Sequence, residues 1–259
     1  MAAPNAGAVG PAGGARLPEQ KLHSIKAPSA DALRALIRSR TDISPEGTLP
    51  MASALRFGAL GPRAVHLCVD MQTLFAERTD WHVPWLERVL PAVMRLAEAR
   101  RGQTVFTRFV PPDRPEEASG AWRRYYEHWR NMTRDRINPR LIELVPPLAA
   151  LAPPDRVIDK AHYSPFKEAA FLRTLGWLKA EALVISGAET DVCVLAAVMD
   201  AVDAGYRVIL AGDALCSASD ESHDAMLRHF GARFSQQVEI ASTEEILSGW
   251  RAGEARALG

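Results

Sequence analysis

The sequence predicts an α/β protein of three layers, in which a six-stranded, mostly parallel sheet carries helices on both faces. Short runs rich in Val, Ile and Leu recur along the chain, as expected of strands that are buried on both faces. Amphipathic stretches separate these runs, and a glycine follows several of them, where a helix normally ends. Strand and helix in alternation lead to right-handed crossovers and parallel pairing.

The expected elements alternate from residue 64 onward. Gly102, Gly205 and Gly231 are expected to end three of the helices. The strands are expected at 64–69, 103–109, 156–159, 182–186, 206–212 and 236–240, and the helices at about 84–101, 166–180, 191–204, 220–230 and 243–251.

The connection between the second and third strands, residues 110–154, interrupts this alternation. It contains the tract AWRRYYEHWRNM, which holds four aromatic residues. Connections of this length usually carry a helix of their own or a function. Two interpretations stay open: a surface helix with an aromatic packing face, or one wall of a substrate pocket.

Composition excludes several classes of protein. Hydrophobic residues make up 47% and charged residues 24%, which is typical of globular proteins. The 31 Lys and Arg are balanced by 31 Asp and Glu, so the basic surface of a nucleic-acid binder is not expected. No apolar run reaches the length of about 18 residues that a membrane span needs. Three cysteines, an odd number, favour a reducing compartment and therefore a cytoplasmic location.

One domain with an N-terminal extension is expected. Residues 1–20 are expected to form a flexible tail, because the start of the chain is rich in Ala, Gly and Pro and lacks the features of a signal peptide. Residues 21–60 would form an extension, in which 30–40 have the apolar spacing of a short helix. Residues 61–259 would form the main domain, a size that is common for a single α/β unit.

Three residues that can carry chemistry lie at or after the carboxyl ends of expected strands. Asp70 closes the first strand, Lys160 closes the third, and Cys193 follows the fourth after a turn. In open parallel sheets, ligands bind beyond the carboxyl ends of the strands. Each residue also has a structural explanation, as a helix cap, a solvated cation or a small buried side chain. Cys68 and Cys216 fit that structural explanation better than Cys193 does.

Cys193 carries more information because a turn, GAETD, precedes it. Either Thr190 or Asp191 is expected to cap the following helix, which places the sulfur in the first helical turn. There the helix dipole and free N–H groups favour the thiolate. The pKa of a free thiol, about 8.5, is lowered by one or more units in such a place, and further beside a lysine. The sequence therefore predicts a nucleophile that is usable near neutral pH.

Together these motifs resemble the isochorismatase-like cysteine hydrolase family, also called the nicotinamidase or N-carbamoylsarcosine amidase superfamily. The resemblance covers about residues 60–245 and rests on VDMQTLF around Asp70, DKAHYSPF around Lys160, and SGAETDVCVLAAVMDAVDAGYRVILAGDALCS around Cys193. It implies a sheet of strand order 3-2-1-4-5-6, in which the first and fourth strands are neighbours. Asp70 and Cys193 would then face one crevice.

The resemblance also implies a reaction. Asp70 would take the thiol proton, Lys160 would stabilise the charged pair, and Cys193 would attack a carbonyl to form a thioester. The backbone N–H groups of Glu189 and Cys193 would bind the oxyanion, with a cis peptide at Ala188–Glu189. The implied activity is cleavage of a C–N bond in a small, non-peptide amide or carbamoyl compound, without a cofactor.

Nicotinamidases of the family place an Asp-x-His and a further His after the second strand to hold a metal. The segment FTRFVPPDRPEE has no histidine, so no metal is expected; His128 and His162 are interpreted as pocket or surface residues. The expected pocket walls are aromatic residues near strand ends and in the long connection. They are Phe75, Trp81, Trp122, Tyr126, Tyr163 and Phe166.

Two alternatives stay open. A vinyl-ether hydrolase of the isochorismatase type would use the same scaffold without a nucleophilic sulfur, and a non-catalytic member of the family would only bind a ligand. A nucleotide-dependent oxidoreductase is disfavoured, because DMQTLF after the first strand is no glycine-rich phosphate cradle. The expected partners are a small-molecule substrate and further copies of the chain in a homo-oligomer, with neither nucleic acid nor membrane. The helix from Asp191 to Ala204 is the candidate interface.

Overall fold

A computed structural model describes residues 55–257 of the chain, with side chains through residue 254. The tail expected at 1–20 and the helix expected within 30–40 lie outside these residues. The described residues form a six-stranded sheet of order β3-β2-β1-β4-β5-β6, in which every adjacent pair is parallel. The predicted fold class and strand order are therefore confirmed. The strands are β1 (Ala64–Val69), β2 (Thr104–Phe109), β3 (Val157–Lys160), β4 (Ala182–Ala188), β5 (Arg207–Cys216) and β6 (Val238–Ala241).

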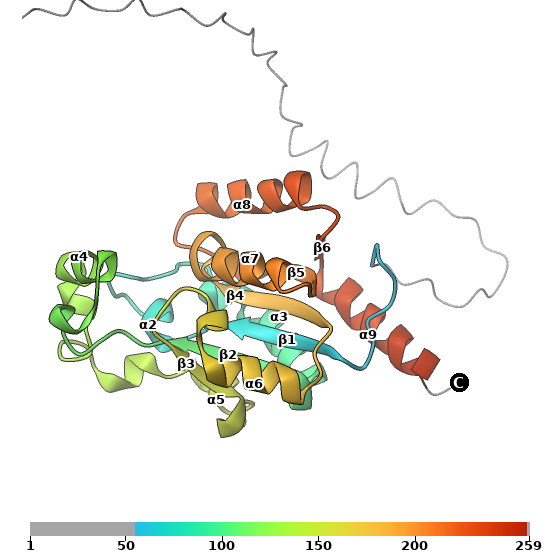
Figure 1. The fold of residues 1–259 in the computed structure, drawn as a ribbon, viewed down its shortest axis with the longest axis horizontal. Helices are drawn as coiled ribbons and strands as arrows, with labels where there is room; N and C mark the ends of the chain where they lie inside the picture. Colours follow the sequence, from blue (N-terminus) through green and yellow to red (C-terminus); the bar gives the residue numbers. More distant parts are fainter. Residues whose placement is uncertain (1–54, 258–259) are drawn as a thin grey trace, which may run out of the picture. The chain divides into compact units, whose positions relative to one another are not determined.

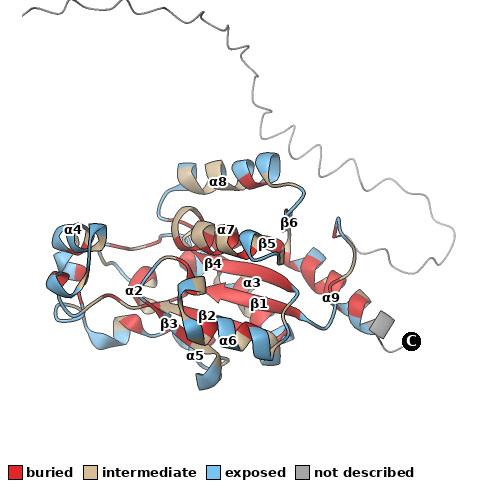
Figure 2. Cartoon of the chain, viewed as in Figure 1, coloured by how far each residue is buried: buried red, intermediate tan, exposed pale blue. Residues whose placement is uncertain are grey.

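Helices cover both faces of this sheet (Figure 1). Buried side chains of α3 and α9 form one core layer, and those of α6, α7 and α8 form the other. The strands are buried throughout most of their length, and the helices expose their outer sides (Figure 2). The α-helices are α2 (Thr73–Ala76), α3 (Leu86–Ala99), α4 (Ala121–His128), α5 (Pro146–Ala149), α6 (Ala169–Trp177), α7 (Leu195–Asp203), α8 (Asp220–Arg233) and α9 (Thr243–Ala257). Shorter helical turns are η1 (Arg101–Gln103), η2 (Pro115–Glu117), η3 (Arg130–Met132), η4 (Pro139–Ile142), η5 (Pro154–Arg156), η6 (Pro165–Lys167) and η7 (Thr190–Val194).

Local sequence explains where the helices begin and which side they bury. In α3, Val89, Val93 and Leu96 are buried, at the spacing that places apolar side chains on one face of a helix. At the start of α8, the Ser219 side chain accepts a hydrogen bond from the backbone N–H of Ser222, which satisfies one of the free donors of the first turn. Among residues 55–257, no helix has the length and apolarity needed to cross a membrane.

The glycine-based helix ends are confirmed only in part. Gly205 follows α7 in the left-handed region, with φ of +83°, where glycine is favoured. Gly102 lies in the short turn η1 that follows α3. The stop predicted at Gly231 is wrong, because α8 continues to Arg233. The burial of Phe230 in this last turn offsets the cost of about 1 kcal/mol that a glycine adds inside a helix.

Residues 55–60, expected in the extension, pack on the described body. Leu55 and Leu60 are buried in the core, and the Arg207 guanidinium donates hydrogen bonds to the carbonyl oxygens of Gly58 and Ala59. Within the described residues, this body therefore begins before residue 61.

Candidate active site

Asp70 follows β1 and is held in place by its neighbour β2. Its backbone N–H donates to the hydroxyl of Thr107 at 3.1 Å, and that hydroxyl donates to Asp70 Oδ1 at 2.6 Å. Asp70 has a φ of +46°, which is uncommon for a residue other than glycine and is found most often at functional sites. The second oxygen, Oδ2, is buried and lies 2.7 Å from Lys160 Nζ. Its partner is therefore a cation and not the Thr107 hydroxyl.

Gln72, two residues after Asp70, joins the end of β1 to the end of β2 and to the turn η4 by hydrogen bonds. Its side chain accepts a hydrogen bond from the Phe109 N–H at 2.7 Å and donates to the carbonyl oxygens of Phe109 and Ile142. Gln72 is fully buried, and a buried amide with these partners fixes the distance between the ends of β1 and β2.

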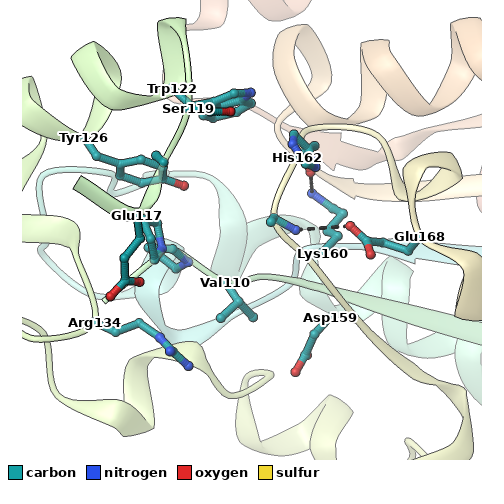
Figure 3. A pocket seen from close by; sticks show the side chains of 14 residues that line it. Val110, Glu117, Ser119, Trp122, Tyr126, Arg134, Asp159, Lys160, His162 and Glu168 are labelled. Carbon is teal, nitrogen blue, oxygen red and sulfur yellow. Dashed lines mark hydrogen bonds between the residues drawn. The ribbon is translucent and has the colours of Figure 1, made fainter. Parts of the chain in front are cut away.

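Lys160 is the last residue of β3, on the far side of β2 from β1. Its Nζ lies 2.7 Å from Asp70 Oδ2 and 3.5 Å from the sulfur of Cys193. It also donates to the carbonyl oxygen of His162 at 3.1 Å, a contact drawn in Figure 3, and lies 5.0 Å from the centroid of the Phe109 ring. Burial by itself lowers the pKa of the Lys160 ammonium, but attraction to Asp70 and Cys193 outweighs it and raises that pKa. The lysine therefore stays charged.

Cys193 reaches the same place from β4. Gly187 in β4 lies so close to β1 that an added Cβ would lie 2.0 Å from the carbonyl oxygen of Val69, so only glycine fits there. The chain then passes through the cis peptide Ala188–Glu189, which confirms that prediction, and enters the π-helical turn η7, which contains Cys193. The structure thus brings Asp70, Lys160 and Cys193 together at the carboxyl ends of three strands.

The predicted cap of this helix is wrong. The residue at the cap position is Glu189, and its side chain makes no capping hydrogen bond. The Thr190 hydroxyl donates instead to the carbonyl oxygen of Cys216 at 3.1 Å, and the Asp191 carboxylate accepts from the Ser217 hydroxyl. Both side chains therefore form hydrogen bonds with the end of β5 and the loop after it, and these segments lie beside them only in the folded chain.

The predicted lowering of the thiol pKa is also wrong. Burial raises the pKa of the Cys193 thiol, and the contact with Lys160 lowers it by less. Asp70 raises it further, as an anion that accepts the thiol proton. In this resting geometry the sulfur is therefore a neutral thiol beside a carboxylate and an ammonium, and it must give up its proton when it attacks.

Cys193 opens into a cavity of about 350 Å³. Phe75, Trp81 and Tyr163, three of the expected pocket residues, line it. The remaining larger side chains of the lining were not expected in the pocket, although two of them stand in the aromatic tract of the long connection. They are Asp80, His82, Phe109, Tyr125, Trp129 and Glu189.

Trp122 and Tyr126, also expected in the pocket, line a separate cavity of about 520 Å³ on the other side of Lys160. Figure 3 shows these two rings of α4 across the cavity from His162 and Lys160. Trp122 packs against Tyr163 with ring centroids 4.7 Å apart, so the two cavities share an aromatic wall. The long connection is thus both a helix with an aromatic packing face and a wall of the candidate site.

Phe166 lines neither of these two cavities. Its ring packs 5.0 Å from that of Phe171 and 6.0 Å from that of Tyr206, in the other core layer. The Ser164 side chain accepts a hydrogen bond from the Phe166 N–H, which starts the turn η6 and directs the ring away from the strand ends.

The histidines expected in or near the pocket do not form a metal centre in the described part of the chain. Figure 3 places His162 at the rim of the larger cavity, 5.7 Å from the Trp122 ring, and the His128 ring packs against Trp129. Across residues 55–257 no group of three or more His, Cys, Asp and Glu side chains is arranged to hold a metal ion. The residues after β2 therefore do not fit the metal site of nicotinamidases.

Solved structures with this fold come from several organisms. A cysteine hydrolase from Pseudomonas syringae pv. phaseolicola is 21% identical over 76% of this chain and 97% of its own, with a TM-score of 0.62. A nicotinamidase from Bacillus subtilis is 22% identical over 68% of this chain and 99% of its own, with a TM-score of 0.55. An N-carbamoylsarcosine amidase from Thermoplasma acidophilum is 18% identical over 70% of this chain and 97% of its own, with a TM-score of 0.55.

At these identities the structures are similar in fold alone, and no curated protein matches the chain. The model of the isochorismatase domain, however, matches residues 64–244. This range contains the whole sheet and all three residues at the strand ends. The chain therefore belongs to the isochorismatase-like hydrolase family.

Proposed function

We propose that this protein hydrolyses a C–N bond of a small, non-peptide amide or carbamoyl compound, with Cys193 as the nucleophile. One observation carries the proposal: Lys160 Nζ lies 2.7 Å from Asp70 and 3.5 Å from Cys193. All three side chains are buried, and the sulfur lines a cavity. A nucleophile, a proton acceptor and a fixed cation within contact distance are the components of covalent acyl transfer.

The reaction would begin with proton transfer from the Cys193 thiol to Asp70 Oδ2. The sulfur attacks the carbonyl carbon of the substrate, and Lys160 stabilises the negative charge while it moves from carboxylate to sulfur. Backbone N–H groups of Glu189 and Cys193 would bind the oxyanion; one such donor contributes about 3 kcal/mol to lowering the barrier.

Asp70 would then return its proton to the leaving nitrogen as the C–N bond breaks, leaving an acyl thioester on Cys193. A water molecule, deprotonated by Asp70, attacks the thioester carbonyl. The C–S bond breaks, the sulfur recovers the proton, and the carboxylic acid or carbamate leaves. The same carboxylate therefore acts as base, acid, base and acid in turn. It would do so through Oδ2, because Oδ1 is bound to the Thr107 hydroxyl.

Ammonia release from a panel of small amides, ureas and carbamoyl compounds tests this proposal. We expect release with at least one compound, and loss of activity by at least about a thousandfold in Cys193→Ala with an unchanged circular dichroism spectrum. Cys216→Ala is the matched control, because this buried cysteine lines neither of the two cavities. Full ammonia release by Cys193→Ala would contradict the covalent mechanism. Absence of ammonia release from every compound would favour vinyl-ether hydrolysis, and binding without turnover would favour a non-catalytic member.

A further inference from the structure

The cavity beside Cys193 is lined by aromatic rings. Trp81 lies at the centre of this group, with ring centroids 5.7 Å from Phe109, 5.9 Å from Tyr125 and 6.4 Å from Trp129. Their planes are inclined to that of Trp81 by 54°, 33° and 71°, so the rings do not form a parallel stack. Phe75 and Tyr163 complete the aromatic lining. Because the face of an aromatic ring carries negative potential, such a lining attracts cations.

The charged side chains of the same cavity have the same sign. Glu189 and Asp80 line it, and no arginine or lysine is among its described lining residues. Lys160, whose Nζ lies 3.5 Å from the Cys193 sulfur, forms an ion pair with Asp70. His82 also lines the cavity. With two carboxylates and neither arginine nor lysine in its described lining, the cavity favours a cation and disfavours a carboxylate.

Glu189 is a partly buried lining residue of this cavity. One of its oxygens accepts a hydrogen bond from the Ala218 N–H at 3.2 Å. Burial raises the pKa of the Glu189 carboxyl, and the nearby Asp191 and Asp70 raise it further. A positive charge in the cavity would favour the charged form of this carboxylate and be attracted by it.

The larger cavity on the other side of Lys160 has a mixed character. Arg134 and Lys160 line it together with Glu117, Asp159 and Glu168, and Figure 3 shows Arg134 and Glu117 on the same wall. Both cations of the larger cavity are paired, Arg134 with Asp113 and Lys160 with Asp70. The two cavities therefore differ in that the described lining of the Cys193 cavity contains carboxylates but neither arginine nor lysine.

We propose that the substrate of this protein is a small amide whose acyl part carries an organic cation, such as a methylated ammonium group. The cation lies among the rings of Trp81, Tyr125 and Trp129 near Glu189, and the amide carbonyl lies at Cys193. The cavity, at about 350 Å³, has the volume of small-ligand sites. This inference rests on the proposed function only for the bond that is cleaved, and the preference for a cation can be measured without turnover.

Two amides of the same shape and size, one cationic and one neutral, measure the effect of the positive charge on affinity. In trimethylammonioacetamide a quaternary nitrogen stands where 3,3-dimethylbutanamide has a carbon. Titration calorimetry with Cys193→Ala is expected to show at least about tenfold tighter binding of the cation, in line with a desolvated cation–π contact. Succinamate, which carries a carboxylate, is expected to bind most weakly. Equal affinity for the first two amides, or tighter binding of the neutral one, would overturn the inference.

Turnover by the unmodified protein distinguishes this inference from the proposed function. Release of ammonia from both amides at equal kcat/KM would support the amidase and overturn the cation preference. Selective binding of the cation without any ammonia release would support the cation site and count against the amidase. Faster release from the cationic amide by about tenfold would support both.

Variants locate the preference in the cavity. Trp129→Leu and Glu189→Gln are each expected to lower the ratio of cation to neutral affinity severalfold. Trp85→Leu is the matched control, because Trp85 is exposed, packs under Arg88 at 4.3 Å and does not line this cavity. An unchanged ratio in both cavity variants, with native circular dichroism spectra, would contradict the placement of the cation.

Discussion

Two buried polar clusters lie on neighbouring strands of the sheet, one in its middle and one at its carboxyl edge. In the middle, the ring nitrogens of His66 in β1 lie 3.3 Å from the Thr104 hydroxyl in β2 and 2.8 Å from the Ser186 hydroxyl in β4. Burial lowers the pKa of His66 to about 3, so the ring is neutral at physiological pH. Each ring nitrogen has a partner, and the cluster holds strands together.

The edge cluster begins at Asp70, four residues after His66. It differs from the middle cluster because its groups are charged and lie beside a cavity. Asp70 and Lys160 form an ion pair there, with Asp70 Oδ2 2.7 Å from the ammonium nitrogen. Cys193 lies 3.5 Å from the same nitrogen and lines a cavity. The same strands therefore support a cluster of neutral, paired polar groups in the middle of the sheet and a cluster of charged groups beside a cavity at its edge, an arrangement typical of functional sites.

The largest expected effect comes from Lys160→Met. Since this change leaves the Asp70 carboxylate buried without a counter-ion, the free energy of unfolding should fall by about 3 to 5 kcal/mol, and activity by at least about a thousandfold. Urea unfolding and ammonia release measure the two effects. Asp70→Asn in the same chain should restore much of the stability and none of the activity. Lys167→Met, at an exposed lysine, is the control.

The middle cluster should respond to acid. Because the pKa of His66 is lowered in the folded chain, the unfolded chain binds the extra proton. The stability that the neutral ring provides is complete above the ordinary pKa of about 6.5 and falls by about 1.4 kcal/mol for each pH unit between there and about 3. His66→Gln should reduce this slope in urea unfolding measured between pH 6.5 and 4. An unchanged slope would mean that His66 is not the responsible group.

Two threonines of β2 sharpen the comparison. Thr107→Val removes the hydroxyl that bonds Asp70, and Thr104→Val removes the one beside His66. Each loss leaves a buried polar group unsatisfied and should lower the free energy of unfolding by about 1 to 3 kcal/mol. Only Thr107→Val should also lower kcat, because its hydroxyl orients the proposed base. An equal drop in kcat for both variants would refute the distinction between the clusters.

Alkylation reports the ionisation of Cys193. Iodoacetamide should label Cys193 before Cys68 and Cys216. All three cysteines are buried, but Cys193 lines the cavity of about 350 Å³, which neither of the other two does. Because the pKa of the Cys193 thiol is raised, the labelling rate should still increase about tenfold per pH unit up to pH 9. Mass spectrometry of digests gives site and rate. A rate that levels off below pH 8 would indicate a thiolate at rest.

Most of the fold could be predicted because its signals are local. Runs of Val, Ile and Leu and the amphipathic spacing between them located the six strands and the five main helices, although α9 continues six residues past its expected end at residue 251. The stop at Gly231 failed because packing of Phe230 outweighed the local preference of glycine. Asp70, Lys160 and Cys193 could be singled out because each lies at or after the end of a strand, and parallel strands bring their carboxyl ends to one edge.

The sequence by itself determined the sheet, its crossovers and the three candidate residues at the strand ends, since these follow from periodicity and from position relative to strand ends. Only the tertiary structure decided that Thr107 orients Asp70, that Phe166 packs into the other core layer, and that the Glu189 side chain enters the cavity. It also decided that the pKa of the Cys193 thiol is raised and not lowered. That direction depends on how completely the fold removes water from the sulfur, a property of distant segments packing together that no local pattern records.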